Sequence, residues 1–252
     1  MIILSSPAKT QDFKTDWNSV VQTMPEFLKD AAQIVQVVQG MSKARLAKVM
    51  KISPQLTDLN YERYQQWSIA DHKKSGKPAI LAYRGDIFKQ MYPTKYTKEQ
   101  QLYAQHSIRF LTGLYGMLRA YDLMLPYRLE MNAHVAAGGT KDLFKFWEHK
   151  LTASLNKDLS DEKDPLLVDA ASGEYSTPID FEAIKYPWVR IEFREKEEKG
   201  LRNVGIFSKK ARGVLLEYCI VNQVNTREEL KKFNQDGYTY LRETKNEIMF
   251  VR

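Results

Sequence analysis

Cysteine is nearly absent from this chain: Cys219 is the single cysteine among 252 residues. One thiol cannot form an intramolecular disulfide. A peroxidatic cysteine needs surroundings that stabilise its thiolate, and it usually has a resolving partner. Cys219 lies instead in an apolar helical stretch, which is typical of a buried thiol that fills the core. The sequence therefore argues against a protein that reduces peroxide with its own thiol.

Long apolar runs are missing as well. No stretch approaches the ~18 apolar residues that would span a bilayer. The segment from Met1 to Pro7 has no basic stretch followed by a longer apolar run and a cleavage site, so we predict no signal peptide. We expect a cytoplasmic protein without a membrane partner.

The residue patterns of metal and nucleotide-loop sites are also absent. The histidines are scattered, without a His-Glu-x-x-His motif or a cysteine pair: His72, His106, His134 and His149. We therefore expect neither a metal nor another cofactor. The segment Ser5-Ser6-Pro7-Ala8-Lys9-Thr10 lacks the glycines and the ending of a Walker loop. Ser6 as a cap and Pro7 in a first helical turn would aim amides at a ligand, with Lys9 adding charge. Taken alone, such a segment is more often a turn.

Basic residues, by contrast, are abundant and unevenly distributed. Lys and Arg number 38 against 31 Asp and Glu, a net charge of +7, which favours an anionic partner. Residues 41–51 carry four basic side chains and no acid, and residues 200–213 do the same. Residues 72–95 carry six basic side chains with Asp86 as the single acid. A merely solvated surface does not need this segregation.

Strand and helix patterns are mixed along the chain, without a regular strand–helix–strand rhythm. Strands are predicted at 2–4, 79–83, 166–168, 188–195 and 201–207, with a terminal hairpin at 238–241 and 248–251. Helices are predicted at 23–38, 42–52, 53–67, 97–112, 142–155 and 208–222, with a short one from Thr226. There is no internal repeat, and residues 158–165 resemble a surface loop more than a linker. We predict an α+β (mixed α/β) fold in a single compact domain, 1–252.

The predicted helix beginning at Ser208 carries three cations in its first turn: Lys209, Lys210 and Arg212. Cations at this end oppose the helix dipole by about 0.3–1 kcal/mol each. A phosphate bound there would reverse the effect. The alternative is that the side chains extend into solvent, where screening makes the penalty small. We favour phosphate contact.

The segment Gly113-Leu-Tyr-Gly116 lies between two predicted apolar helical segments, the second ending with Arg119. Two glycines three apart permit a tight hairpin with exposed backbone N–H groups. Such a hairpin can hold a DNA backbone without reading bases. An ordinary helix–helix turn packed in the core explains the motif equally well.

Carboxylates offer a different interpretation. Asp86, Glu130 and Glu174 would form a catalytic site if they converged beside Lys9 and Arg128, although their spacing does not require it. The alternative function is then an enzyme of unknown reaction that acts on a phosphate-containing or nucleotide-like substrate. A deep closed pocket with perturbed carboxylates would favour the enzyme, and a broad open basic groove would favour DNA. No catalytic constellation is recognisable, so we expect a non-enzyme.

Eight motifs occur in order along the chain and together point to a known family. They are Ser6-Pro-Ala-Lys-Thr10, Arg84-Gly-Asp-Ile-Phe88, Leu111-Thr-Gly-Leu-Tyr-Gly-Met-Leu-Arg119, Leu125-Pro-Tyr-Arg-Leu-Glu-Met131, Lys141-Asp-Leu-Phe-Lys-Phe-Trp147, Ala171-Ser-Gly-Glu-Tyr175, Lys209-Lys-Ala-Arg-Gly213 and Phe233-Asn-Gln-Asp-Gly-Tyr238. The sequence resembles the YaaA family of bacterial peroxide-stress proteins from end to end. Two positions depart from the family pattern: Ala120 replaces an expected proline, and Gly173 replaces Asn or Asp.

The resemblance implies a compact mixed fold with a positively charged cleft and a helix-hairpin-helix element. It implies binding of duplex and branched DNA, a link to recombinational repair, and protection from peroxide and free iron. No enzymatic activity is established for the family. The hairpin would correspond to Gly113–Gly116, and the cleft would be lined by Lys9, Arg84, Arg128, Lys209, Lys210 and Arg212.

We therefore expect a DNA-binding protein of the peroxide-stress response that contacts phosphates without base specificity. Arg119 and Arg128 would add long-range attraction. If about four phosphates are neutralised, the slope of log affinity against log salt should be near −3.6. An iron-binding protein is a third interpretation, disfavoured by the scattered histidines and lone cysteine.

Overall fold

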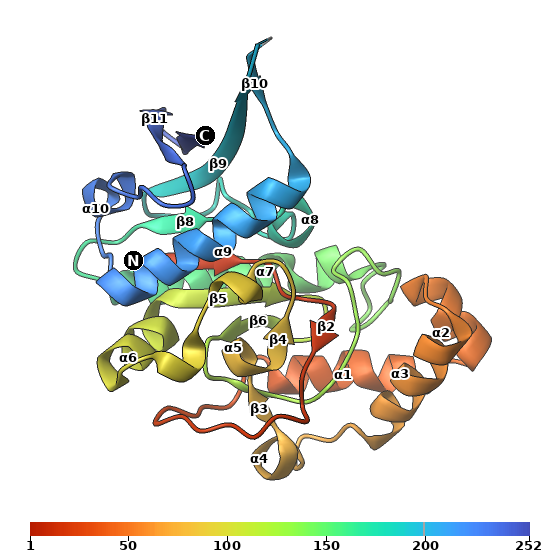
Figure 1. Ribbon diagram of the computed structural model, residues 1–252. Coiled ribbons are helices and arrows are strands. Elements are labelled where there is room, and N and C mark those ends of the chain that lie inside the picture. The colour runs from red at the N-terminus through yellow and green to blue at the C-terminus, as the bar shows by residue number, and fades with distance from the viewer. Residues whose placement is uncertain (199) are drawn as a thin grey trace.

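The structure is a computed structural model that describes residues 1–198 and 200–252. Within them, one main sheet unites strands from both ends of the chain (Figure 1). Its strand order is β11 (Thr239–Glu243), β12 (Glu247–Val251), β9 (Trp188–Glu197), β8 (Leu167–Asp169), β1 (Ile2–Ser5), β5 (Ile108–Thr112) and β6 (Gly116–Arg119). The strand β10 (Gly200–Arg202) pairs with β9 beyond this path. The mixed α/β fold class is confirmed.

The five central strands of this sheet are parallel. Ile3 of β1 is in register with Ile108 of β5 on one side and with Val168 of β8 on the other. Taken in chain order, the parallel strands β1, β5, β8, β9 and β12 are arranged 2-1-3-4-5 across the sheet. The chain passes from β1 to β5 on one side of β1 and then crosses to β8 on its other side. The switch point of the sheet therefore lies between β1 and β8. In open parallel sheets, ligands bind at the carboxyl ends of the strands at this point.

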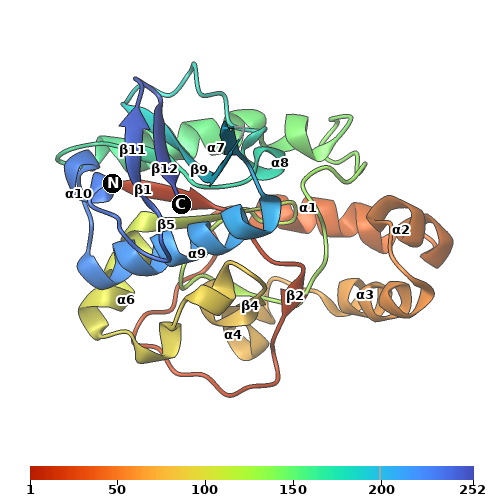
Figure 2. The same cartoon turned by 45° about the horizontal axis from the view of Figure 1, so that its top comes forward.

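Helices cover both faces of the sheet. The helix α9 (Gly205–Asn222) crosses in front of it in Figure 1, and α7 (Leu143–Ser160) lies behind. Figure 2 shows the two on opposite sides of β1 and β5. All four residues of β1 are buried, as expected for a strand covered on both faces. Further helices in the described residues are α1 (Leu28–Gln39), α4 (His72–Ser75), α6 (Lys98–Ser107), α8 (Gly173–Ser176) and α10 (Arg227–Lys231).

A pair of helices projects from one side of the sheet, apart from the layers (Figures 1 and 2). They are α2 (Lys43–Met50) and α3 (Pro54–Gln66), joined by a three-residue turn. Ser42 caps α2 by accepting a hydrogen bond from the Arg45 amide, and Ser53 caps α3 before Pro54. Both starts were predicted from the sequence, because Ser at the cap and Pro at the first position satisfy or remove orphan amides.

Short elements complete the fold around the first strand. The strand β2 (Thr10–Gln11) pairs with β4 (Tyr83–Arg84), and β3 (Lys77–Pro78) pairs with β7 (Leu123–Met124). The segments η1 (Phe88–Gln90) and η2 (Pro93–Lys95) are single 3₁₀ turns. The β2–β4 pair fixes the chain that follows β1 beside Arg84.

Several sequence predictions of elements are wrong. Residues 79–83 form a short helix, α5 (Ala79–Ala82), followed by β4, and not a strand. The helix predicted from residue 97 ends at Ser107, and its continuation is strand β5. The first helix begins at Leu28, because Thr23 instead bridges to Asp122. The last long helix begins at Gly205, so the predicted strand at 201–207 is reduced to the end of β10.

In the part of the chain that the structure describes, no helix is long and apolar enough to cross a bilayer.

Candidate nucleic-acid interface

The loops that follow β1 and β8 meet at the carboxyl edge of the sheet. The Ser172 amide donates a hydrogen bond of 2.9 Å to the Ser6 hydroxyl, and the Ser6 hydroxyl lies 3.2 Å from that of Ser172. Beside this junction opens a cavity of about 720 Å³. Its walls come from four segments of the chain: Lys9, Arg45, Lys48, Val49, Met50, Lys51, Arg128, Glu130, Asn132, Ala133, His134 and Glu174.

Glu130 is the central anion of the cavity. Its Oε1 atom lies 3.1 Å from Lys9 Nζ and 3.1 Å from Arg128 Nη2. Glu130 is 8% exposed, whereas the Lys9 side chain is 62% exposed and reaches the surface. The Tyr64 hydroxyl on α3 donates a hydrogen bond of 3.1 Å to the Arg128 carbonyl and so holds this segment against the helical pair.

Three polar atoms in this cluster have no hydrogen-bond partner within the described chain. They are Glu130 Oε2, Glu174 Oε1 and Arg128 Nε, and all three are buried. Buried polar atoms are normally paired. Glu130 and Glu174 line the cavity, and each has one carboxylate oxygen without a partner, which a hydrogen-bond donor of a ligand would satisfy.

A smaller hollow continues inward from the same residues. It is lined by Lys9, Arg128 and Glu130 together with Pro7, Ala8, Gln11, Tyr127, Leu129 and Tyr175. The Tyr127 and Tyr83 hydroxyls lie 2.6 Å apart, and burial raises the pKa of Tyr127 to about 12. Burial likewise raises the pKa of Tyr175, and the nearby Glu174 adds to that rise. These phenols are therefore neutral donors at neutral pH.

The helix α2 supplies the outer wall of the cavity. Arg45, Lys48 and Lys51 line it, are exposed, and form no ion pair with any described residue. Lys51 ends the helix in a left-handed conformation, which turns the chain toward α3. On the far side of α2, Lys43 is neutralised by Asp58 at 2.6 Å. The unpaired cations of this helix are therefore on its cavity side.

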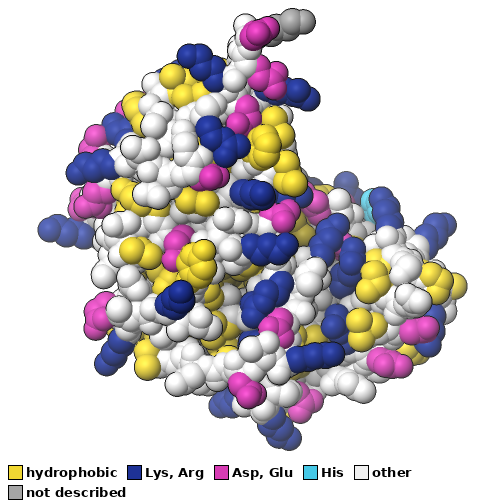
Figure 3. Space-filling model, in the orientation of Figure 1, with side chains coloured by type: hydrophobic (Ala, Val, Ile, Leu, Met, Phe, Trp, Pro, Cys, Tyr) yellow, Lys and Arg dark blue, Asp and Glu magenta, His cyan; other side chains and the backbone are white. Residues whose placement is uncertain are grey.

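Basic side chains are also separated from acidic ones on the molecular surface. In Figure 3, Lys and Arg side chains gather across the middle of the face, over the region between the start of α9 and the α2–α3 pair. The face is hollowed between the upper lobe that carries β10 and the lobe that carries α2. Acidic side chains are fewer within this band than around it.

Comparisons with known proteins decide the family. A family model described as "Peroxide stress protein YaaA" matches residues 1–244. The chain belongs to the YaaA family of peroxide stress proteins. It is 37% identical to a UPF0246 protein of Crocosphaera subtropica, with all of both chains covered. It is 37% identical to one of Saccharophagus degradans, over 100% of this chain and 99% of the other. A third, from Flavobacterium johnsoniae, is 36% identical, with 95% and 94% covered.

Membership in the YaaA family confirms the resemblance and connects this chain with peroxide stress. Among the site residues predicted from the sequence, Lys9 and Arg128 come together in the cavity. Arg84 lies beside them along the backbone, since Thr10 pairs with Arg84. Its guanidinium, however, binds Asp12 at 2.9 Å and the Leu81 and Tyr83 carbonyls at 3.0 Å. Arg84 therefore holds the loop after β1 in place.

The segment Gly113–Gly116 is not a hairpin between helices. Residues 113–115 form the turn between β5 and β6, Gly116 begins β6, and all four residues are buried. A Cβ on Gly113 would lie 2.7 Å from the Leu129 carbonyl oxygen, and the Trp147 indole donates to the Gly113 carbonyl at 3.1 Å. This turn therefore packs in the core, and the helical pair of this fold is α2–α3.

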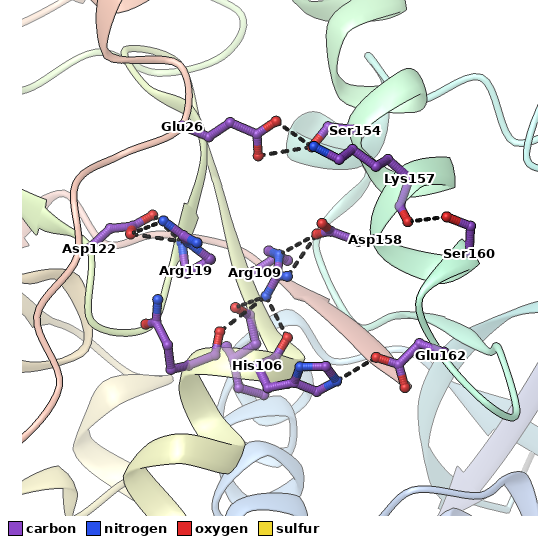
Figure 4. Close-up of polar contacts among 12 residues, drawn as sticks. Glu26, His106, Arg109, Arg119, Asp122, Ser154, Lys157, Asp158, Ser160 and Glu162 are labelled. Carbon is purple, nitrogen blue, oxygen red and sulfur yellow. Dashed lines mark hydrogen bonds and ion pairs between the residues drawn. The ribbon is translucent and has the colours of Figure 1, made fainter.

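Arg119 lies at the opposite edge of the sheet. It is the last residue of β6, which is antiparallel to β5, and its backbone is in register with that of Arg109. Figure 4 shows Arg119 turned toward Asp122 and Arg109 turned toward Asp158. Arg119 also donates to the Met24 carbonyl at 3.0 Å. Because the cavity is at the carboxyl edge of β1, the structure does not bring Arg119 to it.

The three cations near the start of α9 have different surroundings. Lys209 and Lys210 are exposed, but neither lines the cavity. Arg212 is half-buried, its Nε atom has no partner in the described residues, and burial lowers its pKa. Asp169 and Glu192 are close enough to oppose that shift. Ser208 is buried and bonded to Asn203, so it does not cap this helix.

The structure also tests the other groupings of residues. Glu130 and Glu174 converge with Lys9 and Arg128, but Asp86 does not line the cavity. No group of three or more potential metal ligands occurs in the described residues. Sequence reasoning missed Arg45, Lys48 and Lys51 as site residues. The signal that could have found them was the acid-free basic run at 41–51.

Proposed function

We propose that this protein binds duplex or branched DNA through backbone phosphates, without strong base specificity, as its part in the peroxide-stress response. By occupying DNA it would help to limit iron-dependent oxidative damage. The observation that carries the proposal is the convergence of cations from three chain segments on one hollow. Lys9 follows β1, Arg128 follows β7, and Arg45, Lys48 and Lys51 belong to α2 and its turn.

Arg45, Lys48 and Lys51 are suited to phosphates because, unlike Lys43, they form no ion pair with a described carboxylate. Lysine and arginine side chains that neutralise phosphates release condensed counterions, and this release supplies most of non-specific DNA affinity. The helical pair stands out from the sheet (Figure 2) and can approach a backbone without obstruction. We infer that α2–α3 takes the role that the resemblance assigned to a helix-hairpin-helix.

The contacts available on this wall position a backbone but do not read a sequence. Arg45, Lys48 and Lys51 occupy the last two turns of one helix and its cap, so they would follow a strand of phosphates. The face between α9 and α2 carries further cations (Figure 3), which would draw DNA toward the hollow from a distance. We assign Lys209 and Lys210 this long-range contribution.

The test is fluorescence anisotropy with labelled duplex and four-way-junction DNA at low salt. We compare wild type with a Lys48→Glu, Lys51→Glu double variant. The matched control is Lys73→Glu, Lys74→Glu, which makes the same charge change at two exposed positions of α4. Reversing two phosphate-contacting charges should lower affinity by roughly tenfold or more, and the control by much less.

Equal losses in the two variants would mean that net charge alone drives binding, and would overturn the assignment to α2. Failure of the wild type to bind either DNA at low salt would overturn the function itself. Circular dichroism and thermal melting establish that each variant is folded. All the exchanged side chains are exposed, so we expect unchanged melting.

A further inference from the structure

We propose that the floor of the cavity is a subsite for a single unstacked nucleotide, with its phosphate on the cations of the rim and the hydrogen-bond donors of its base on Glu130 and Glu174. The nucleotide comes either from an unpaired position in bound DNA or from the free nucleotide pool. The first source rests on the proposed DNA binding, and the second does not.

The position of the cavity supports a nucleotide. The loops after β1 and β8 flank the switch point of the parallel sheet, and they supply Lys9 and Glu174 to the cavity. Open sheets bind ligands, among them phosphate-bearing cofactors, outside the carboxyl ends of the strands at this point. A duplex bound non-specifically through its phosphates would make no use of the carboxylates at this position.

The unpaired acceptors indicate what the ligand must donate. Glu130 is 8% exposed and uses Oε1 for Lys9 and Arg128, while Oε2 is buried and has no partner among the described residues. Glu174 Oε1 is likewise buried and has no partner among the described residues. A backbone phosphate brings only acceptors and cannot satisfy these atoms. The amino group and ring N–H of a base can.

The arrangement of charge divides the site in two. Lys9, Arg45, Lys48 and Lys51 are on the outer side, where a phosphate can keep part of its solvation. Glu130 is deeper, at the junction with the smaller hollow lined by Tyr127 and Tyr175. One nucleotide has this same polarity, an anionic phosphate at one end and a donor-bearing planar base at the other.

Size separates a nucleotide from a duplex. The cavity of about 720 Å³ is within the range of about 300–1,000 Å³ typical of small-ligand sites. A single base with its sugar fits this volume, whereas a base pair within a stacked duplex does not enter it. Carboxylate acceptors accept from amino groups such as that of cytosine. We therefore expect guanine, adenine or cytosine to be preferred over thymine, which has no amino group.

The experiment uses 2-aminopurine, an amino-bearing base whose fluorescence rises when it leaves the stack. Wild type is titrated against a duplex with one 2-aminopurine bulge and against the matching perfect duplex. We expect roughly tenfold tighter binding of the bulged duplex, the order of one good hydrogen-bonded pair, with increased fluorescence. Glu174→Gln should abolish this preference, and it should change the affinity for perfect duplex no more than removal of the same charge outside the cavity does. The matched control is Glu182→Gln, an exposed carboxylate away from the cavity.

A second arm tests the free nucleotide. Calorimetry with deoxyguanosine monophosphate, with inorganic phosphate as the control ligand, measures binding to the same proteins. Nucleotide binding that Glu174→Gln abolishes, with phosphate binding much weaker, would support the subsite and identify the free pool as a source. Bulge preference without free-nucleotide binding would support it with DNA as the source.

Three results would overturn the subsite: no bulge preference together with no free-nucleotide binding, an unaltered preference in both Glu174→Gln and Glu130→Gln, or an equal loss in Glu182→Gln. None of these affects the affinity for perfect duplex, so the proposed function would stand. Nucleotide binding without any DNA binding would leave the subsite and remove the proposed function. Glu174 is half-buried and forms no ion pair in the described chain, so Glu174→Gln is expected to fold.

Discussion

The hydroxyl of Tyr115 donates a hydrogen bond to Nε2 of His72, 3.0 Å away and wholly within the core. The direction of the bond follows from the other ring nitrogen. His72 Nδ1 lies 3.0 Å from the Ser68 carbonyl, which can only accept, so Nδ1 carries the proton. The Tyr115 oxygen in turn accepts from the Trp67 indole and the Leu125 amide, both at 3.1 Å. The buried turn between β5 and β6 is thus joined to α4 by a fully paired polar network.

This network makes stability depend on pH. Burial lowers the pKa of His72 below the ordinary value of 6.5. As the pH falls below 6.5, the unfolded chain takes up a proton that the folded chain refuses, so the free energy of unfolding decreases. The contribution is fully present above 6.5, and the loss for one proton is at most about 1.4 kcal/mol per pH unit. Urea denaturation between pH 7.5 and 5.5 measures it.

The control for this prediction is His149→Gln, since the His149 side chain is 95% exposed. This variant should show the same decrease between pH 7.5 and 5.5 as the wild type. His72→Gln should be less stable at pH 7.5 but should lose less stability on acidification. If His72→Gln kept the full decrease, another group would be responsible.

Gly116→Ala should destabilise the fold by about 2–4 kcal/mol, the sum of left-handed strain and overpacking. Gly116 has φ +67°, and an added Cβ would lie 2.6 Å from Trp147 Cε3. Gly139→Ala is the matched control, because Gly139 has φ +78° but no neighbour within 4 Å of the added atom. It should show the strain alone, about 1 kcal/mol. Differential scanning calorimetry compares the two.

The same variant tests the role of the turn. Because the turn is buried, Gly116→Ala that is folded at low temperature should bind DNA as the wild type does. A loss of DNA affinity in Gly116→Ala, measured at a temperature where the variant is fully folded and absent from Gly139→Ala, would show that the turn belongs to the interface.

Neutralising Arg45, Lys48 and Lys51 with glutamine should flatten the salt dependence of DNA binding. Each phosphate contact contributes about 0.9 to the slope of log affinity against log salt, so the triple variant should lose about 2.7. Anisotropy titrations from low to physiological salt give the slope. Lys209→Gln with Lys210→Gln should change it less, because neither residue lines the cavity. An unchanged slope in the triple variant would remove α2 from the contact.

Cys219 should be inert to peroxide and to thiol reagents in the native protein. It is 0% exposed on α9, and burial raises the pKa of its thiol, which disfavours the reactive thiolate. Mass spectrometry after treatment with hydrogen peroxide should find it reduced, and unfolding in urea should expose it to Ellman's reagent. Sulfenic acid at Cys219 in folded protein would show that the chain senses peroxide directly.

Much of this fold can be predicted from local sequence chemistry without any knowledge of tertiary contacts. Ser42, Ser53 with Pro54, Thr97 and Thr226 start helices where the sequence predicts them, because each side chain accepts from an amide within its own first turn. The family was also evident from ordered motifs alone. The resemblance that these motifs carry also predicts Lys9 and Arg128 as residues of the cleft.

Only the tertiary structure decided which segments became strands and which cations share a surface. Ile108–Thr112 continues a helical pattern in sequence, but it lies next to β1 with all five residues buried, and a fully buried strand has no alternation to reveal it. The sequence predicts a phosphate site at the Ser208 segment, yet the helix begins earlier, at Gly205, and Arg212 is half-buried, near enough to Asp169 and Glu192 for them to raise its pKa. Lys9 and Glu174 are far apart in the chain and meet because the parallel strands β1 and β8 bring their carboxyl ends to one edge, where Lys48 of α2 and Arg128 after β7 join them. The spacing of residues in the sequence does not reveal which of them meet at that edge, since the pairing of strands depends on packing across the whole domain.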